Sequence, residues 1–435
     1  MIVSLFSEER DMIKQKGKIF TLLFVSALSA DILYAGGTVS PVVETATLKT
    51  FSFLSNVQAH GELRPRYEYV NTDNTTGNAS AFTNRLMLGV SADLLNVSGL
   101  SVYLEAINVA GSGNYWDLSA NDSDRGVYNV VADPSQTRIS QAYVDYAFSN
   151  SLLRAGRQGV NLDNQRFIGT VNWRQMPQTY DAVAFSNHSI EGLSLMAAYV
   201  WHVNTIFTND SVLPNGTPKS SGFDTGTVLL HATYKINDAL ALTAYDYMIE
   251  DVHDTYGIAA TGKFALSEGT GLSYRAEYAK QTDPTFDALT TNKTADADYY
   301  NLEATLNMSG FLAGVRYEVL GVENGGNAAF STPLATLHGQ NGWADMFLGT
   351  PTDGLVDVNG MIGYKAKGFG VAKIVYHDFS SDRGSTDYGT EIDVLYKNKI
   401  SAVKGLSGML KASFYNADTY KVDTTKYWVM LDYTF

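Results

Sequence analysis

The last nine residues, 427–435, alternate between apolar and mostly polar side chains. One face of an extended strand here would carry Tyr427, Val429, Leu431, Tyr433 and Phe435, and the other Lys426, Trp428, Met430, Asp432 and Thr434. Successive side chains of a β-strand point to opposite sides, whereas a helix would mix the two sets. One apolar and one polar side is typical of a transmembrane strand between lipid and water. The period of two therefore predicts a membrane-spanning strand.

The same alternation recurs in segments spread along the chain beyond residue 58. These segments are 61–70, 84–94, 193–203, 299–308, 311–319 and 388–397. The apolar set of 193–203 runs over every second residue from Leu193 to Val203, and that of 388–397 from Tyr388 to Tyr396. The opposite faces carry many ionised residues, which are costly to bury unpaired but are hydrated inside a water-filled barrel. The pattern predicts an all-β protein, a transmembrane antiparallel β-barrel with these apolar sets facing lipid.

The expected connections between strands alternate in length. Short ones lie at 96–99, 149–151, 189–192, 237–239, 267–270, 309–310 and 366–368. Longer ones lie near 71–81, 110–136, 161–179, 204–222, 283–297, 322–354 and 418–424. Short periplasmic turns and long extracellular loops are the pattern of bacterial outer-membrane barrels, and this count gives about 18 strands. In 240–249 and 369–378 either face could point outward.

Composition excludes several other classes of protein. The formal charge of −14, without a basic cluster, argues against a nucleic-acid partner, because phosphates must be neutralised. The 435 residues contain no cysteine, no domain linker and no nucleotide motif, so neither a redox site nor a cofactor is expected. The 27 Tyr and 38 Gly suit the aromatic girdles and tight turns of a barrel.

The amino-terminal residues have the composition of a secretory signal peptide. A lysine-rich stretch at 14–18 precedes the apolar run 19–28, and small residues follow, with a cleavage site expected after Ala30 or Ala35. The apolar run is short for a membrane span. Acidic residues before Met12 do not suit the start of a signal, so Met12 is a candidate for the true start. We expect three parts: a signal peptide at 1–35, a periplasmic segment at 36–57 and an outer-membrane barrel at 58–435.

Two of the long loops carry a more specific signal. The first is 156–183, GRQGVNLDNQRFIGTVNWRQMPQTYDAV, and the second joins 332–338, TPLATLH, to 342–345, GWAD. Both resemble the alginate-export-like, Opr-type outer-membrane porins of proteobacteria and their relatives, and the resemblance extends in outline over 60–435. It implies a porin of about 18 strands in the bacterial outer membrane, surrounded by lipid and lipopolysaccharide. The terminal Phe435 likewise resembles the signal by which the barrel-assembly machinery recognises such barrels.

The third long loop is the first candidate for a constriction of the pore. The charged and aromatic residues that bracket it are Arg157, Asp163, Arg166, Trp173, Arg174 and Asp181. Arginine offers fixed bidentate donors for carboxylates, so these guanidinium groups would face passing solutes. Alternatively, the arginines pair with the two aspartates and only attach the loop. Both interpretations predict that the loop lies inside the barrel.

Other inward charges separate by sign along the chain. The basic ones come first, at Arg64, Arg66 and Arg85, so all six arginines are expected to cluster on one wall. The later ones are more often acidic, at Glu303, Glu318, Asp357, Glu391 and Asp393. Opposed basic and acidic walls would set up a transverse field in the pore. The alternative is a solvated lumen without a particular pattern.

The loop at 332–347 is the second candidate for narrowing the pore. It places the apolar side chains of Leu334, Leu337, Trp343 and Phe347 around His338 and Asp345. Apolar groups are unfavourable in an exposed loop, so an amphipathic plug inside the lumen is expected. No second His or Cys is spaced to bind a metal with His338, and the acidic run 121–126 lacks the bidentate Glu of a calcium loop, so no metal is expected.

Together these features predict a passive diffusion channel for small hydrophilic solutes, with a preference for organic anions or acidic sugars through the arginines. One alternative is a dedicated polysaccharide exporter. The family's alginate exporter has a dense arginine-rich lumen for a polyanion, whereas the lumen candidates here are mixed in sign. Another alternative is an outer-membrane hydrolase, for which Asp251, His253 and Asp254 are the nearest arrangement. We expect a channel and no enzyme.

Overall fold

The computed structural model describes residues 53–119, 122–212, 218–220, 222–286, 296–323 and 328–435. The chain divides into two units, Met1–Phe51 and Ser52–Phe435, and only the second contains described residues. The predicted signal peptide at 1–35 and most of the predicted segment at 36–57 lie outside the described residues. The barrel begins earlier than predicted, because β1 starts at Leu54 rather than at residue 58.

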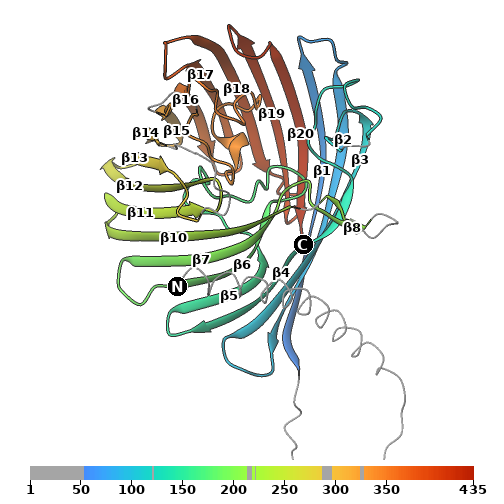
Figure 1. Ribbon diagram of the computed structural model, residues 1–435, viewed down its shortest axis with the longest axis vertical. Helices are drawn as coiled ribbons and strands as arrows, with labels where there is room; N and C mark the ends of the chain where they lie inside the picture. The colour runs from blue at the N-terminus through green and yellow to red at the C-terminus, as the bar shows by residue number, and fades with distance from the viewer. Residues whose placement is uncertain (1–52, 120–121, 213–217, 221, 287–295, 324–327) are drawn as a thin grey trace, which may run out of the picture. The chain divides into compact units, whose positions relative to one another are not determined.

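An 18-stranded antiparallel sheet forms the barrel (Figure 1). Each strand pairs with the next strand of the barrel along the chain, and β1 closes the sheet by pairing with β20. The strands are β1 (Leu54–Thr72), β2 (Ala79–Leu94), β3 (Leu100–Asn114), β4 (Gln136–Phe148), β5 (Ser151–Gln158), β6 (Thr179–Asn187), β7 (Leu193–Asn204), β10 (Phe223–Asn237), β11 (Leu240–Ile249), β12 (His253–Ser267), β13 (Thr270–Thr282), β14 (Asp296–Met308), β15 (Phe311–Leu320), β16 (Leu355–Ala366), β17 (Gly370–Ser380), β18 (Asp387–Lys399), β19 (Leu406–Ala417) and β20 (Thr424–Thr434). The predicted fold class is confirmed.

Small elements of the described part of the chain also lie outside the barrel sheet. The strands β8 (Asn209–Val212) and β9 (Pro218–Ser220) pair with each other between β7 and β10. A 3-10 turn, η2 (Leu337–Gly339), lies between β15 and β16. Among the described residues, no helix is long and apolar enough to cross a membrane.

The predicted alternation of faces is confirmed in the C-terminal strand. In β20 the side chains of Tyr427 and Val429 are exposed outside, whereas those of Trp428 and Met430 are buried inside. The outer surface is apolar elsewhere as well, and Val315 of β15 is 66% exposed there. In a transmembrane barrel this outer surface contacts lipid, which explains why so many large apolar side chains are left without protein neighbours.

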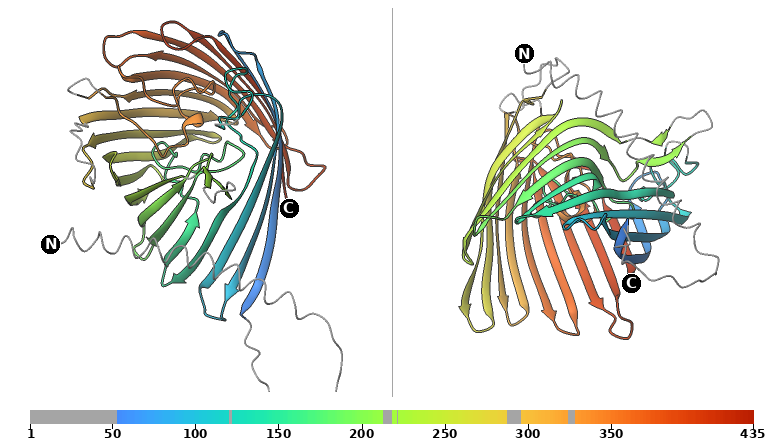
Figure 2. Two further views of the ribbon diagram at one scale, coloured as in Figure 1. Left: turned by 45° about the vertical axis from the view of Figure 1, so that its right-hand side comes forward. Right: turned by 90° about the horizontal axis from the view of Figure 1, so that it is seen from below.

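The lengths of the connections agree with the prediction. The predicted short turns join strands at one end of the barrel and the predicted long loops at the other (Figure 2). The prediction missed the turn 400–405 and two brief connections at the loop end, 250–252 and 381–386. In the two segments whose orientation was open, Leu242 of β11 and Ile374 of β17 point outward.

Two residues predicted to face lipid are buried inside instead. A bulge at 200–202 of β7, opposite 181–182 of β6, shifts the later residues by one position and turns Val203 inward. A second bulge, where β17 pairs with β18 near Gly389, does the same for Tyr388. A bulge reverses the faces of a strand without changing its composition, so the period of two alone does not reveal it.

Two long connections fill part of the barrel interior. They are loop 159–178, between β5 and β6, and loop 321–354, between β15 and β16. The largest cluster of buried apolar side chains joins Phe167, Leu334 and Phe347 of these loops to strand residues such as Tyr299. The rings of Phe167 and Tyr299 lie 5.3 Å apart between centroids. The loops therefore pack against the inner wall as a core.

Candidate functional site

Three arginines of β1 and β2 bind the second half of loop 159–178. Arg64 Nη1 donates to the carbonyl oxygen of Asn172 at 2.9 Å, and Arg66 Nη1 donates to that of Trp173 at 2.7 Å. Arg85 Nη1 donates to Asn172 Oδ1 at 2.5 Å. The three side chains are 9%, 0% and 4% exposed. They contact the loop rather than open water.

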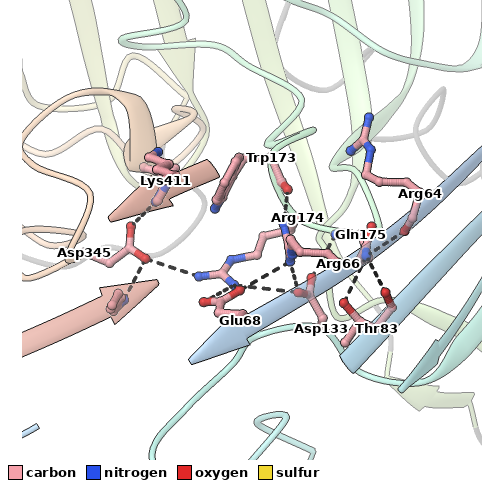
Figure 3. Close-up of polar contacts among 12 residues, drawn as sticks. Arg64, Arg66, Glu68, Thr83, Asp133, Trp173, Arg174, Gln175, Asp345 and Lys411 are labelled. Carbon is pink, nitrogen blue, oxygen red and sulfur yellow. Dashed lines mark hydrogen bonds and ion pairs between the residues drawn. The ribbon is translucent and has the colours of Figure 1, made fainter. Parts of the chain in front are cut away.

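Arg174 continues this network toward loop 321–354 (Figure 3). Its guanidinium lies 3.1 Å from Glu68 Oε2 on β1 and 3.2 Å from Asp345 Oδ2 in the second loop. Asp133 Oδ2 is 3.7 Å from Arg174 and also pairs with Arg66. Burial alone would lower the pKa of Arg174, but the carboxylates of Glu68, Asp133 and Asp345 raise it above its usual range. Arg174 therefore stays charged and joins both loops to β1.

The six arginines do not share one wall, contrary to the prediction. Those at 64, 66, 85 and 174 cluster at β1 and β2, but Arg166 Nε lies 2.9 Å from Glu318 Oε1 on β15. Arg157 stays on β5 and pairs with Asp181 at 2.8 Å. The loop crosses the lumen, so residues a few positions apart reach different strands.

Asp163 marks a further contact of loop 159–178 with the wall. Its Oδ2 lies 3.0 Å from His231 Nε2 on β10 and 3.8 Å from Arg275 on β13. Sequence reasoning offered neighbouring arginines as its partners, but the strand residues that approach it come from later in the chain. Together with the contacts at β1, β2 and β15, this pairing fixes the loop across the barrel.

Four of the five predicted acidic residues lie beneath loop 321–354. Glu318, Asp357, Glu391 and Asp393 are fully buried, and Glu303 on β14 stays partly exposed. The loop supplies their hydrogen-bond donors. The Asn341 side chain donates to Glu318 at 2.5 Å and to Asp357 at 3.1 Å. The backbone amide of Trp343 donates to Asp393 at 3.2 Å, and that of Ala344 to Glu391 at 2.8 Å.

These contacts differ from the expected open walls of opposite sign. Charges on both sides of the lumen are paired with loop groups and with each other, because buried charges need such partners to offset lost hydration. The basic side at β1 and β2 includes the carboxylates of Glu62 and Glu68, which pair with Arg64 and Arg66. The charged residues on both sides of the lumen thus attach the two loops to the inner wall of the barrel.

His338 and Asp345 of loop 321–354 meet at the inner face of β19 and β20. His338 Nδ1 lies 2.7 Å from Asp345 Oδ1, and Lys426 Nζ lies 2.9 Å from Asp345 Oδ2. The indole of Trp173 stacks on the His338 ring with 4.2 Å between centroids. Burial opposes ionisation of Asp345, but His338, Lys426 and Arg174 hold its pKa well below the usual range. The two inward loops therefore touch each other here.

Lys411 of β19 belongs to this cluster and escaped the sequence prediction. Its Nζ lies 2.7 Å from His338 Nε2 and 3.7 Å from the centroid of the Trp343 ring. The signal was present in the alternation of β19, because Leu410 points outward and Lys411 is therefore an inward residue. A single lysine between apolar neighbours gave no reason to single it out.

Comparisons with known proteins agree with this geometry. A family model described as alginate export matches residues 61–197, which confirms the predicted resemblance over that part of the chain. Among solved structures, OpdQ of Pseudomonas aeruginosa is 15% identical with a TM-score of 0.64, covering 88% of this chain and 99% of that chain. OccAB2 of Acinetobacter baumannii is 19% identical with a TM-score of 0.65, covering 88% and 99%. OpdK of Pseudomonas aeruginosa, solved with vanillate, is 16% identical with a TM-score of 0.67, covering 88% and 100%.

This chain has the fold of the Opd and Occ outer-membrane porins. The closed barrel and its apolar outer surface place it in the bacterial outer membrane, in contact with lipid. No curated protein sequence matches the chain.

The barrel also carries inward lysines that sequence reasoning missed. We call them the lysine row: Lys365 of β16, Lys373 of β17, Lys397 and Lys399 of β18, and Lys411 of β19. Strand pairing places Lys365 and Lys397 on either side of Val371, and Lys373 and Lys411 on either side of Leu395. Between Lys411 and the short turns, the inward positions of the described strands β16–β19 hold no carboxylate. On these four strands, the inner wall between Lys411 and the turns therefore carries positive charge only.

The residues considered for a hydrolase attach loops to β12. His253 Nε2 lies 3.1 Å from Ser331 Oγ, and Asp254 Oδ2 accepts a hydrogen bond from the Thr285 amide at 3.0 Å. In the described ranges, no group of three or more His, Asp or Glu is arranged to hold a metal ion. Asn121, the first residue of the acidic run 121–126, lies outside those ranges.

Proposed function

We propose that this chain is a passive, water-filled channel for small hydrophilic solutes, with a preference for organic anions, and that it has no enzymatic activity. The observation that carries the proposal is a closed barrel whose two inward loops are attached to several walls, with the exposed lysines of the row, Lys365, Lys397 and Lys399, between those loops and the turn end. A solute would pass the loops and then move along the lysines.

The attachment of the loops favours small solutes over a polymer. Loop 159–178 contacts β1 through Arg174, β10 through Asp163 and β15 through Arg166. A polysaccharide exporter needs a continuous wide path, and moving this loop would break several buried ion pairs at once. Removing one partner of a buried pair typically costs about 3–5 kcal/mol. The loop is thus a constriction that is held on several walls, which supports a diffusion channel over an exporter.

The lysine row supports the preference for anions. Arg64, Arg66, Arg85 and Arg174 have carboxylates or loop carbonyls as partners, so they leave little free positive charge. Lys365, Lys397 and Lys399 are exposed on the inner side of the wall. Charges that line a pore set its selectivity at short range. The similar OpdK was solved with vanillate, an aromatic carboxylate, which agrees with this class of solute.

Reversal potentials across planar bilayers in a salt gradient test the preference. We expect anion selectivity in the native chain and its loss in a Lys365→Ala, Lys397→Ala, Lys399→Ala variant. The matched control is Lys280→Ala, Lys404→Ala, Lys421→Ala, which removes the same charge from an outward strand position, a turn and an outer loop. A cation-selective native channel, or equal effects of the two triple variants, would contradict the role of the row. Liposome swelling with sugars and carboxylates tests the channel itself.

Both ends of the chain have proposed roles in reaching the outer membrane. We infer that residues 1–35 are a signal peptide and that Phe435 is read by the barrel-assembly machinery, because the C-terminal strand β20 closes the barrel against β1. Mass spectrometry of the native amino terminus tests the first inference. The second predicts that Phe435→Ala lowers the amount of folded barrel in the outer membrane, whereas the outward Leu431→Ala does not.

A further inference from the structure

An ammonium group lies among four aromatic rings where the two inward loops meet. Lys411 Nζ is 3.7 Å from the ring centroid of Trp343, 4.3 Å from that of Trp173 and 5.4 Å from that of Trp428. His338 is the fourth ring, with Nε2 2.7 Å from the same Nζ. A cation within about 6 Å of an aromatic face is attracted by it, and most strongly by Trp. We call these four rings the ammonium cage.

The members of the cage come from separate parts of the chain. Trp173 belongs to loop 159–178, and His338 and Trp343 to loop 321–354, whereas Trp428 belongs to β20 and the ammonium to β19. Figure 3 shows Trp173 and Lys411 close together beside Arg174 and Asp345. The occupied cage thus joins both loops to the wall through one charged group.

The hydrogen bonds fix the protonation of His338. An ammonium can only donate, so His338 Nε2 must accept from Lys411. The imidazole proton therefore lies on Nδ1, where it is donated to Asp345 Oδ1 at 2.7 Å. The ring between Lys411 and Asp345 is neutral in this arrangement. Stacking of Trp173 on the ring, at 7° between planes, depends on the same orientation.

We propose that the ammonium cage, filled by the chain's own Lys411, is an acid-sensitive latch that keeps both loops in the lumen. The proposal rests on the channel function proposed for the barrel and adds its regulation. Protonated His338 would place a second N–H and a second positive charge against the ammonium, so it is incompatible with the closed latch. Below pH 6.5 the two loops would separate from each other and from β19 and β20, and the pore would widen at this point.

The charges around the His338 ring determine whether acid opens or closes the latch. Burial lowers the pKa of His338 from 6.5 to about 3, with Lys411 and Arg174 acting in the same direction and Asp345 against them. Lys426 forms an ion pair with Asp345, which is the hydrogen-bond partner of the ring. Glu391 and Asp393 of β18 attract the Lys411 ammonium electrostatically, and Lys373 of β17 repels it. A lowered pKa means that the closed latch binds fewer protons than the open one. Protonation of His338 therefore weakens closure about tenfold per pH unit between pH 6.5 and about pH 3, and it has no effect on closure above pH 6.5.

Chemical rescue tests the occupancy of the cage. The Lys411→Ala variant should have a higher single-channel conductance than the native chain. Adding methylammonium chloride should lower it again, whereas sodium chloride at equal ionic strength should not. Lys421→Ala is the matched control, because Lys421 Nζ also lies over an aromatic ring, 5.1 Å from Tyr420, but outside the cage. If methylammonium and sodium act alike on Lys411→Ala, the cage does not bind the ammonium as proposed.

A fluorescence titration tests the acid response without relying on conduction. Replacing Trp116 and Trp201 with Phe leaves the three cage tryptophans as the only indoles among the five of the chain. Their emission should change on acidification below pH 6.5, and His338→Gln should abolish the change because the amide oxygen accepts from Lys411 without titrating. A change that persists in His338→Gln would overturn the latch. If the barrel conducts no ions but the fluorescence titration is as expected, the proposed channel function is wrong and the latch is still supported.

Discussion

Arg174 Nη2 and Asp345 Oδ2 lie 3.2 Å apart and join the two loops that fill the barrel. Arg174 also pairs with Glu68 on β1, and Asp345 with Lys426 on β20, so the pair connects the loops to the two strands that close the sheet. Constriction and barrel closure therefore share one ionic network. Changes in this network are expected to alter both conductance and stability.

The first prediction concerns Arg174→Gln. It removes the charge between Glu68 and Asp345 and leaves both carboxylates with one partner fewer in a buried site. Breaking a buried pair in this way typically costs about 3–5 kcal/mol. We expect a lower unfolding temperature in heat-modifiability gels and a raised single-channel conductance.

Arg383→Gln is the control for Arg174→Gln. Arg383 pairs with Asp353 at 2.5 Å, but both side chains are 50% exposed at the loop end. An exposed pair is worth about 0–1 kcal/mol. Equal losses of stability in the two variants would show that the buried network does not carry the loops.

The second prediction concerns deletion of residues 334–347. The deletion removes the donors of Asn341, Trp343 and Ala344 from four buried carboxylates on β15, β16 and β18. Conductance should rise, and the uncovered carboxylates should shift the reversal potential toward cations. Unchanged conductance would place this loop outside the path of the ions.

Those features of the fold that depend on residues close together in the sequence were predicted correctly. The period of two predicted the strands and their outward faces, because each strand meets lipid on one side and water or loops on the other. The same reasoning placed Trp173 and His338 in two separate inward loops. It did not predict that the rings would stack at 4.2 Å, because residues distant in sequence met by the path of each loop through the barrel.

Partners of the inward charges were the least predictable part. Arg166 was expected beside the other arginines, but it pairs with Glu318, far along the chain. The period of two predicts that a charged side chain points into the barrel. It does not predict which strand or loop supplies its partner. Lys411 was missed for a similar reason, since its role depends on tryptophans from three other segments. The bulges that turn Val203 and Tyr388 inward break the period itself.

The third prediction concerns the lipid-facing surface. Val315 of β15 is 66% exposed on the outer face, with the membrane as its surroundings. An arginine on the lipid face costs about 2–4 kcal/mol near the bilayer midplane. Val315→Arg should therefore reduce the yield of folded barrel in outer-membrane fractions. Ser273→Arg, on the inner face of β13, should assemble normally, and equal yields would place Val315 away from the hydrocarbon region.

The last prediction compares two glycines of loop 321–354. Gly342 has a φ of +77°, and a Cβ there would lie 2.5 Å from Glu391 Oε2, so Gly342→Ala must strain the backbone and push the loop off β18. Gly339 lies three residues earlier in the same loop, and a Cβ there would meet nothing within 4 Å. Gly342→Ala should raise the conductance and lower the unfolding temperature, whereas Gly339→Ala should leave both close to native. Because both variants add one methyl group to one loop, a difference between them can only come from the contact with Glu391 and the left-handed backbone. Native conductance in Gly342→Ala would mean that this contact does not set the width of the pore.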